Sequence, residues 1–407
     1  MKKPLVGLSL AILLIALDAS TALALNKVWA GTGPGPDNWS AGANWVGGVA
    51  PVAGDDLTFP DPTVGPLSTN TNNNFQSGTS FNSLTLNGPY TVTGNGFQLD
   101  GVNPTVALTV GPAQKAVIST GAIFMHQISA NATTDISVGA GSTLDMSATP
   151  QVTVGGSPPN VTNLVLTIGT AGQLLGPASL TVDTFHLTGS GKFVPKLVTQ
   201  NANTPGTILT DPGTQIATSL NAGAALSSSS SMTINGDLLE AVSAQSTGGL
   251  DFQGPVTFGN TANVSWEAFN SNVDNVINFT HSVDLSPAKF HIQLPAGFKP
   301  YAPNAVYPVI TSQGPAFTPA TEFFDMKEGQ TQTVGGYIFT ARYNVPDPGD
   351  FRVEVSGPPP SVPSPPATGA MAPAPSSPSL PAPAGALLGL VFLLLVTGTA
   401  TFRWRRP

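Results

Sequence analysis

The residues best suited to catalysis or metal binding are few and scattered along the chain. No two of the four histidines stand at a metal-ligand spacing such as i, i+4. His186 lies between Phe185 and Leu187, so we expect its ring to point outward from a strand. The histidines are His126, His186, His281 and His291. The sequence therefore predicts no metal site.

Acidic residues form one cluster, Asp55, Asp56 and Asp61. It is open to two interpretations, a weak Ca²⁺ site and a polar turn. The turn is favoured because no D-x-D-x-D-G loop is present. The other acids stand singly, mostly near turns, where carboxylates bond to neighbouring backbone N–H groups. They include Asp100, Asp135, Asp145, Asp183, Asp211 and Asp237.

A polysaccharide lyase would need clustered carboxylates for Ca²⁺ and a basic residue as proton acceptor. Arg342 and Arg352 are the only arginines before the C-terminal tail. We predict a non-enzyme, with no catalytic, cofactor-binding or metal-binding residues and no cofactor. The alternative is a lyase or hydrolase with carboxylates converging beside Arg342, Arg352 or a lysine. A third possibility is a flat Thr-x-Thr array that recognises ice or another surface. Such an array begins at Thr85 and at Thr91-x-Thr93 but does not persist.

The elements that would position these residues are short strands. Apolar residues alternate with polar ones in pairs separated by Gly, Asn and Asp, which is the period-2 pattern of strands joined by tight turns. Examples are Phe97-x-Leu99, Leu108-x-Val110, Ile123-x-Met125, Ile136-x-Val138, Leu164-x-Leu166-x-Ile168, Leu180-x-Val182 and Phe185-x-Leu187. Strands this short, with small frequent turns, favour a parallel β-helix of on the order of ten rungs, with a β-sandwich as the alternative. The pattern leaves open whether residues 205–285 continue the helix.

Composition limits the function classes. Charged residues make up 9% of the 407 residues, the net charge is −8, and there is no cysteine. Such a surface repels nucleic acid, and disulfides and thiolate metal sites are excluded. Trp29, Trp39 and Trp45 lie close together near the start, and we expect them to form a local core that caps the first rung.

The two ends of the sequence predict export and membrane anchoring. Lys2 and Lys3 precede an apolar run and an A-x-A site at Ala22–Ala24, which indicates a signal peptide of residues 1–24 rather than a retained anchor. Residues 357–383 are a Pro-rich linker, and residues 384–402 are uncharged and long enough to cross a bilayer. The basic tail 403–407 then indicates a cytoplasmic C-terminus.

This C-terminal pattern resembles the PEP-CTERM-like sorting signals that exosortases process, with Leu380-Pro381-Ala382-Pro383 at the motif position and Ala382 in place of the usual acid. A plain transmembrane anchor is the alternative. Trp29-x-Gly31, Asn38-Trp39, Asn44-Trp45, Gly54-Asp55 and the segment from Asn72 to Asn95 resemble autotransporter-associated β-strand repeat proteins. That resemblance implies surface location and a right-handed parallel β-helix, and it supplies no catalytic motif.

We therefore predict an all-β, right-handed parallel β-helix with a Trp-rich cap at residues 25–60, a solenoid at 61–286 and a C-terminal β cap at 287–356. We expect an exported, envelope-anchored, non-enzymatic protein with an adhesin, biofilm-matrix or surface-structural role. Its expected partners are the membrane through the C-terminal helix, an exosortase-like processing enzyme, and extracellular polysaccharide or other surface proteins, with no nucleic acid.

Overall fold

The computed structural model describes residues 24–33, 37–64, 67–100, 106–125, 132–155, 162–200, 207–217, 224–227, 231–240, 249–268 and 276–357. All of them belong to one compact unit, residues 1–360. The predicted signal peptide, apart from its last residue, lies outside the described residues, as do nearly all of the Pro-rich linker, the apolar segment and the basic tail.

Three sheets make up this unit. The first sheet runs β1 (Asn26–Val28), β2 (Asp56–Phe59), β5 (Ser83–Leu86), β8 (Val106–Val110), β11 (Ala132–Val138), β14 (Thr162–Ile168), β17 (Thr184–Gly189), β20 (Ile208–Thr210), β23 (Met232–Ile234) and β26 (Val256–Phe258). The second runs β3 (Asn70–Asn73), β6 (Thr91–Gly94), β9 (Lys115–Thr120), β12 (Thr143–Asp145), β15 (Gln173–Leu175), β18 (Lys192–Val194), β21 (Gln215–Ala217), β24 (Asp237–Glu240), β27 (Asn263–Glu267) and β29 (Lys289–Gln293).

The third sheet runs β4 (Thr79–Phe81), β7 (Phe97–Leu99), β10 (Ile123–Met125), β13 (Val152–Val154), β16 (Leu180–Val182), β19 (Leu197–Gln200), β22 (Ala224–Ser227), β25 (Leu250–Gln253), β28 (Ile277–Phe279) and β30 (Val306–Ser312), and then continues into β33 (Phe351–Ser356), β32 (Tyr337–Tyr343) and β31 (Thr331–Val334). Two short 3₁₀ turns, η1 (Gly42–Asn44) and η2 (Pro62–Val64), complete the described elements.

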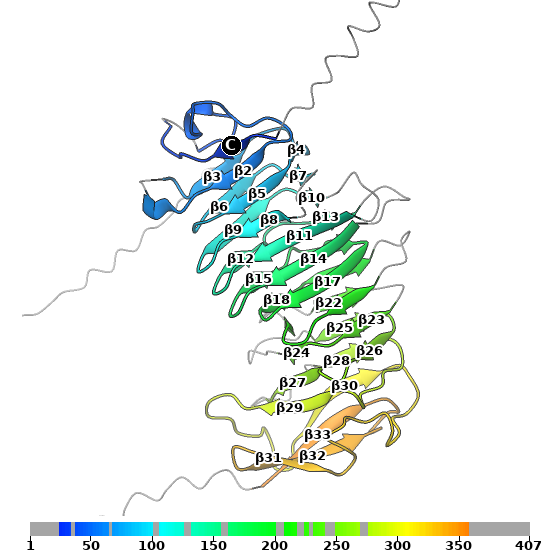
Figure 1. Ribbon diagram of the computed structural model, residues 1–407. Coiled ribbons are helices and arrows are strands. Elements are labelled where there is room, and N and C mark those ends of the chain that lie inside the picture. The colour runs from blue at the N-terminus through cyan, green and yellow to red at the C-terminus, as the bar shows by residue number, and fades with distance from the viewer. Residues whose placement is uncertain are drawn as a thin grey trace, which may run out of the picture. The chain divides into compact units, whose positions relative to one another are not determined.

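From β2 to β28, neighbouring strands of each sheet are three apart in chain order, so the chain visits the sheets in turn and climbs one rung per circuit. Among the described strands, the pairs up to β30 are parallel, as between β11 and β14, and the pairs among β30 to β33 are antiparallel. The fold is a right-handed parallel β-helix, as predicted, and the β-sandwich alternative is wrong. The rungs succeed one another from blue to yellow in Figure 1. Within residues 205–285, the described strands β20 to β28 belong to this stack, because they extend the same three sheets.

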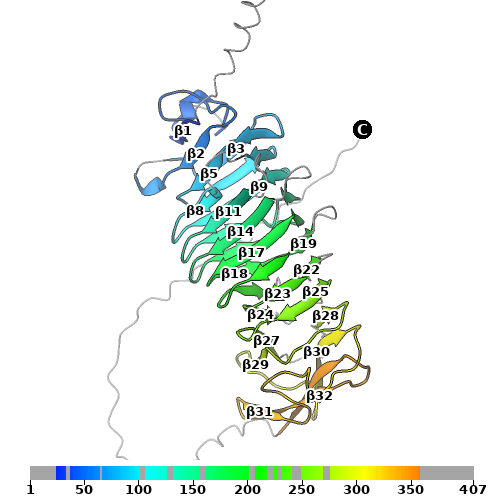
Figure 2. The ribbon, with the colours of Figure 1, turned by 45° about the vertical axis from the view of Figure 1, so that its right-hand side comes forward.

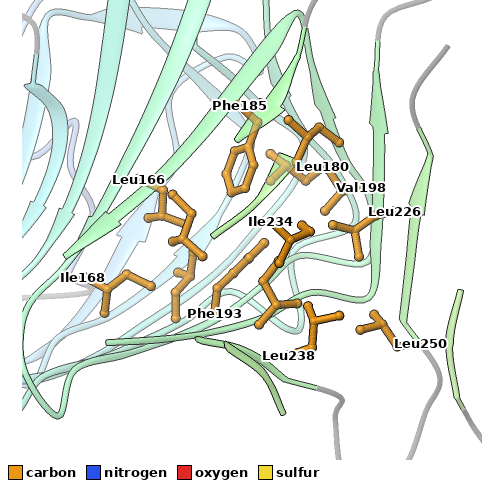
Figure 3. Close-up of a cluster of buried hydrophobic side chains, with 14 of the residues drawn as sticks. Leu166, Ile168, Leu180, Phe185, Phe193, Val198, Leu226, Ile234, Leu238 and Leu250 are labelled. Carbon is orange, nitrogen blue, oxygen red and sulfur yellow. The ribbon is translucent and has the colours of Figure 1, made fainter. Parts of the chain in front are cut away.

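The predicted alternation explains the core. In β14 every second residue is buried, from Thr162 through Leu166 to Ile168, and the residues between them are partly exposed. Inward side chains from the three sheets meet along the axis, where Phe185 and Phe193 lie 5.6 Å apart between ring centroids (Figure 3). Burial of these apolar side chains, at roughly 25 cal/mol per Å², holds the rungs together without a disulfide.

The N-terminal tryptophans form the local core that the sequence predicts. The Trp29 and Trp45 rings are 5.2 Å apart and nearly perpendicular, and both contact Phe59. The Trp45 Nε1–H donates to the carbonyl oxygen of Trp39 at 2.7 Å. This aromatic cluster lies at the first rungs, where an apolar edge would otherwise face solvent.

The C-terminal part contains a second aromatic group. Phe290 of β29 contacts Phe323 and Phe351, and Tyr343 lies 4.7 Å from Phe351. The antiparallel strands β32 and β33 thus pack their aromatic residues against the last rungs.

Because Tyr90 and Tyr307 are buried, we expect the protein to lose stability at alkaline pH. Burial raises the pKa of Tyr90 and of Tyr307 to about 12, from an ordinary value of 10.0. Because the fold disfavours tyrosinate, their contribution is complete below pH 10 and is lost as the pH rises toward 12. We expect the free energy of unfolding to fall by on the order of 2 kcal/mol per tyrosine over this range. Urea titrations at pH 9 and pH 12 measure it, and a Tyr90→Phe chain should lose less stability over the interval. Equal losses in both chains would contradict the assignment to Tyr90.

Candidate binding surface on the first sheet

The first sheet has its longest strands at β11, β14 and β17, where its outward residues form a grid of three rows that continues at β20. By register, the first row is Thr133, Asn163 and Thr184, continued by Thr207 just before β20. The second row is Asp135, Val165, His186 and Leu209. The third row is Ser137, Thr167 and Thr188, with Asp211 beyond the end of β20. We call this grid the platform. Figures 1 and 2 both show β11, β14 and β17 side by side.

A hollow of about 280 Å³ opens on the platform between its first and second rows. The partly exposed side chains of Val165 and Leu209 contribute apolar surface to it. Asn163, Thr184 and His186 line its polar side, and the Thr184 hydroxyl donates to the Asn163 amide oxygen. The hollow thus combines an apolar surface with hydrogen-bonding groups, which is the usual composition of a small-ligand site.

His186 points outward as predicted, and its Nε2 lies 2.8 Å from Asp211 Oδ1. Burial raises the pKa of Asp211, but hydrogen bonds from His186 and Thr188 outweigh it and leave that pKa below its ordinary value. An ionised Asp211 holds the Nε2 proton, so Nδ1 is the basic nitrogen of the neutral ring. The sequence did not indicate this pair, because 25 residues separate its members and only the register of β17 with β20 joins them.

A column of hydroxyl groups follows the first sheet along the stack. Six residues in register, each partly exposed, form it: Thr58, Thr85, Thr109, Ser137, Thr167 and Thr188. The parallel column two residues away contains Asp56, Ser83, Asp135 and Val165, so a Thr-x-Thr array does not persist, as predicted. Thr91-x-Thr93 lies on the second sheet and starts a different face from Thr85.

The acidic cluster near the N-terminus is structural. Asp55 is buried and accepts the Val52 backbone N–H at 2.9 Å. Asp56 accepts the side chains of Asn82 and Ser83 on the next rung, at 2.6 and 2.5 Å. Asp61 accepts the Thr63 N–H at 2.9 Å. The three carboxylates thus have separate partners. The turn interpretation fits Asp55 and Asp61, whereas Asp56 joins two rungs.

The remaining predicted residues are also dispersed. His291 Nε2 lies 3.2 Å from Asn263 Oδ1, and His281 Nδ1 lies 3.1 Å from the Thr280 hydroxyl, while His126 is outside the described residues. The turn interpretation holds for Asp145, which accepts the Ser147 N–H. Asp237, the first residue of β24, also lies beside a bend, at Gly236, but its carboxylate accepts the Asn263 amide from the next rung.

Other single acids also bridge rungs. Asp100 accepts the Ser80 hydroxyl at 2.5 Å, and the buried Asp183 accepts the Thr162 N–H at 2.9 Å. Among the described residues, no three His, Cys, Asp or Glu side chains gather as a metal site would require.

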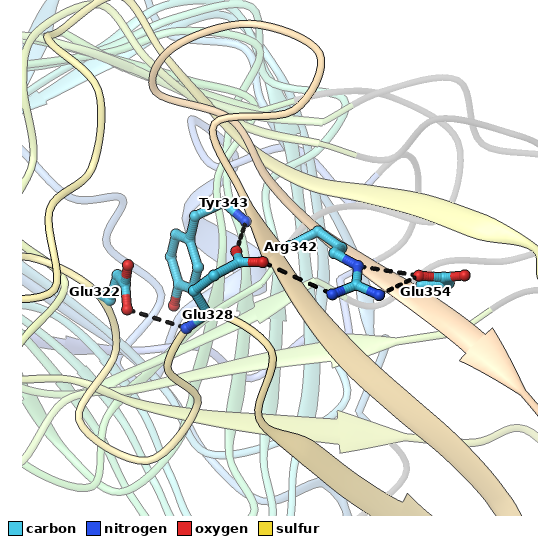
Figure 4. A network of polar contacts seen from close by, with 5 residues as sticks. All are labelled: Glu322, Glu328, Arg342, Tyr343 and Glu354. Atoms are coloured by element: carbon cyan, nitrogen blue, oxygen red, sulfur yellow. Dashed lines mark hydrogen bonds and ion pairs between the residues drawn. The ribbon is translucent and has the colours of Figure 1, made fainter.

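Arg342 is held in an ion-pair network at the C-terminal end (Figure 4). Its Nε and Nη2 donate to Glu354 Oε2 at 3.0 and 2.8 Å, and Nη1 lies 3.7 Å from Glu328. Glu328 also accepts the Tyr343 N–H at 2.6 Å, while its own N–H donates to the buried Glu322. Arg352 pairs with Asp350 at 3.2 Å. A guanidinium engaged in this way fastens β32 to β33 and to the loop carrying Glu328.

Replacing Arg342 by Ala should therefore affect stability modestly. We expect a loss of about 1 kcal/mol in the free energy of unfolding, because the arginine and its partners are partly exposed. Arg342→Met keeps the apolar stem of the side chain, so comparing it with Arg342→Ala separates the contribution of the charge from that of packing. High salt should lower the stability of the parent chain, which contains the ion pairs, but not that of either variant, so the difference between parent and variant should shrink. A loss above roughly 3 kcal/mol, or one that salt does not change, would contradict this role.

A second hollow, of about 310 Å³, lies at the C-terminal end beside Tyr301, Tyr337 and Gly357. Both phenol groups are already committed, since Tyr301 donates to the Val306 carbonyl and Tyr337 to the Phe298 carbonyl. Gly357 is also the first residue of the Pro-rich linker and the last residue that the structure describes. The first-sheet platform therefore remains the stronger candidate.

Within the part of the chain that the structure describes, no helix has the length and apolar character needed to span a bilayer. No protein-family model, curated protein or solved structure matches this chain.

Proposed function

We propose that this chain is an exported, envelope-anchored surface protein that acts without catalysis, as an adhesin, a biofilm-matrix component or a surface-structural element. One observation carries the proposal: the six-residue hydroxyl column from Thr58 to Thr188 on the first sheet. Stacked strands repeat at about 4.8 Å, so the column offers equivalent weak contacts at regular intervals. An extended hydroxylated partner such as a polysaccharide can engage several of them at once, and multivalency then supplies the affinity.

The location rests on the two ends of the sequence. The apolar run and A-x-A site before Leu25 support export, and the apolar segment 384–402 with its basic tail supports anchoring. Cell fractionation followed by N-terminal sequencing tests both. We expect the chain in the envelope with Leu25 as its first residue. A soluble cytoplasmic chain that retains Met1 would overturn the proposed location.

The binding role is tested with the purified full chain and a panel of bacterial and plant polysaccharides, following binding and the release of new chain ends together. We expect binding without turnover. A Thr85→Val, Thr109→Val, Thr167→Val chain should bind at least 10-fold more weakly. The matched control is Thr153→Val, Thr181→Val, Thr199→Val, which alters a hydroxyl column of the third sheet. Equal binding by both triple variants would remove the first-sheet column from the proposal.

The alternative, a polysaccharide lyase or hydrolase with a cleft on the β-helix, is favoured by one observation. The His186–Asp211 pair has the geometry of a base and its orienting carboxylate, and the histidine lines the hollow. Turnover in the same assay that is lost in His186→Gln would establish the enzyme. Turnover that survives in this variant would also defeat the non-enzymatic proposal but would place the chemistry elsewhere.

A further inference from the structure

We infer that the hollow on the platform is a subsite for one unit of a neutral saccharide. The inference rests on the proposed function, because it names the ligand class and the site through which a surface protein of this kind would bind polysaccharide. Its volume of about 280 Å³ is at the small end of ligand sites, which fits a single ring rather than a longer segment.

The apolar part of the hollow argues for a ligand with a C–H face. Val165 and Leu209 occupy outward positions of the second row, on either side of His186. Outward positions of a solvated sheet are usually polar, and the third row follows that rule with Ser137, Thr167 and Thr188. Two apolar side chains at one hollow therefore mark a place where a partly apolar surface can be covered.

The polar groups around these side chains suit hydroxyl groups. The Asn163 amide oxygen accepts from Thr184, and within the described residues the structure gives its Nδ2 no acceptor. His186 uses Nε2 on Asp211 and keeps Nδ1 for a hydroxyl donor. The hollow therefore presents at least one donor and one acceptor beside an apolar floor formed by Val165 and Leu209. A sugar ring presents the complementary groups, hydroxyl groups around a C–H face.

Charge restricts the ligand to the neutral class. The four strands β11, β14, β17 and β20 contain no Lys or Arg, whereas Asp135 and Asp211 belong to the same grid. A uronate, sulfate or phosphate would meet no fixed cation there and would be repelled by both carboxylates. A neutral hexose carries no charge and is not repelled by these carboxylates.

The test measures the affinity of the full chain for neutral oligosaccharides and for oligogalacturonate by calorimetry. Asn163→Asp keeps an acceptor for Thr184 but removes the Nδ2 donor, and Leu209→Asn makes the floor polar. We expect each to weaken neutral-sugar binding at least 10-fold. Leu175→Asn is the matched control, because Leu175 is a partly exposed outward leucine on the second sheet. It should bind as the parent chain does.

The outcomes separate this inference from the proposed function. Neutral-sugar binding that is unchanged in Asn163→Asp and Leu209→Asn would overturn the subsite while leaving a polysaccharide-binding protein. Preference for oligogalacturonate would overturn the neutral class. Loss of binding to the same extent in Leu175→Asn would show a general effect on folding and would also overturn the subsite. Absence of binding to every saccharide would overturn both the subsite and the polysaccharide partner.

Discussion

Replacing Trp39 by Ala is expected to lower the free energy of unfolding by about 3–5 kcal/mol, the range for removing a large buried aromatic side chain. Trp39 is fully buried, and its ring lies 5.5 Å from Phe59, 5.8 Å from Phe81 and 5.8 Å from Phe97, between ring centroids. These phenylalanines belong to β2, β4 and β7, so one side chain joins strands of two successive rungs and two sheets. The loss should therefore affect the whole N-terminal end.

Urea unfolding followed by circular dichroism measures this loss. Trp39→Phe should cost much less than Trp39→Ala, because it keeps an aromatic ring and removes an indole N–H that has no hydrogen-bond partner in the described structure. Val49→Ala is the surface control, since Val49 is 58% exposed and its truncation should change stability by less than about 0.5 kcal/mol. A Trp39→Ala chain as stable as Val49→Ala would mean that the aromatic cluster does not hold the first rungs.

Much of the fold could be predicted because it depends on local patterns. Pairs such as Leu108-x-Val110 and Phe185-x-Leu187 are buried in strands, as their alternation indicates. Short strands with small, frequent turns then favour a β-helix over the longer connections of a sandwich. The tryptophan cluster was also visible, because its three indoles lie within 17 residues of one another.

The platform could not be predicted, because it depends on register between rungs of unequal length. Partners on the first sheet are 30 residues apart between Ile136 and Leu166 but only 21 between Leu166 and Leu187. No fixed period in the sequence therefore aligns Ser137, Thr167 and Thr188, or brings His186 to Asp211. The same argument applies to Asp237, whose hydrogen bond to Asn263 joins residues 26 positions apart on neighbouring rungs.

Gly189→Ala is expected to destabilise the protein by about 3 kcal/mol, because a side chain at this position would disrupt the contact between β14 and β17. Gly189 has a φ of +93°, which costs an L-residue roughly 1–2 kcal/mol. An added Cβ would also lie 2.2 Å from the carbonyl oxygen of Ile168, its register partner. That oxygen accepts hydrogen bonds from the N–H groups of Ser190 and Gly191, both at 3.0 Å. Displacing the oxygen would weaken two hydrogen bonds, each of which contributes about 1 kcal/mol.

Gly213→Ala is the matched control, because it shares the backbone strain without the close approach. Its φ is +83°, and the nearest atom to an added Cβ is 4.0 Å away. Both substitutions restrict the unfolded chain equally, which offsets part of the cost in each. The difference between their urea midpoints, converted with a common m-value, therefore isolates the steric term at Ile168. If that term is real, Gly189→Ala should also speed amide exchange in β17 and weaken saccharide binding at the platform, while Gly213→Ala should do neither. Equal midpoints for the two variants would mean that β14 and β17 can separate at this end without loss, and the platform would then lack the rigid register on which its grid of side chains depends.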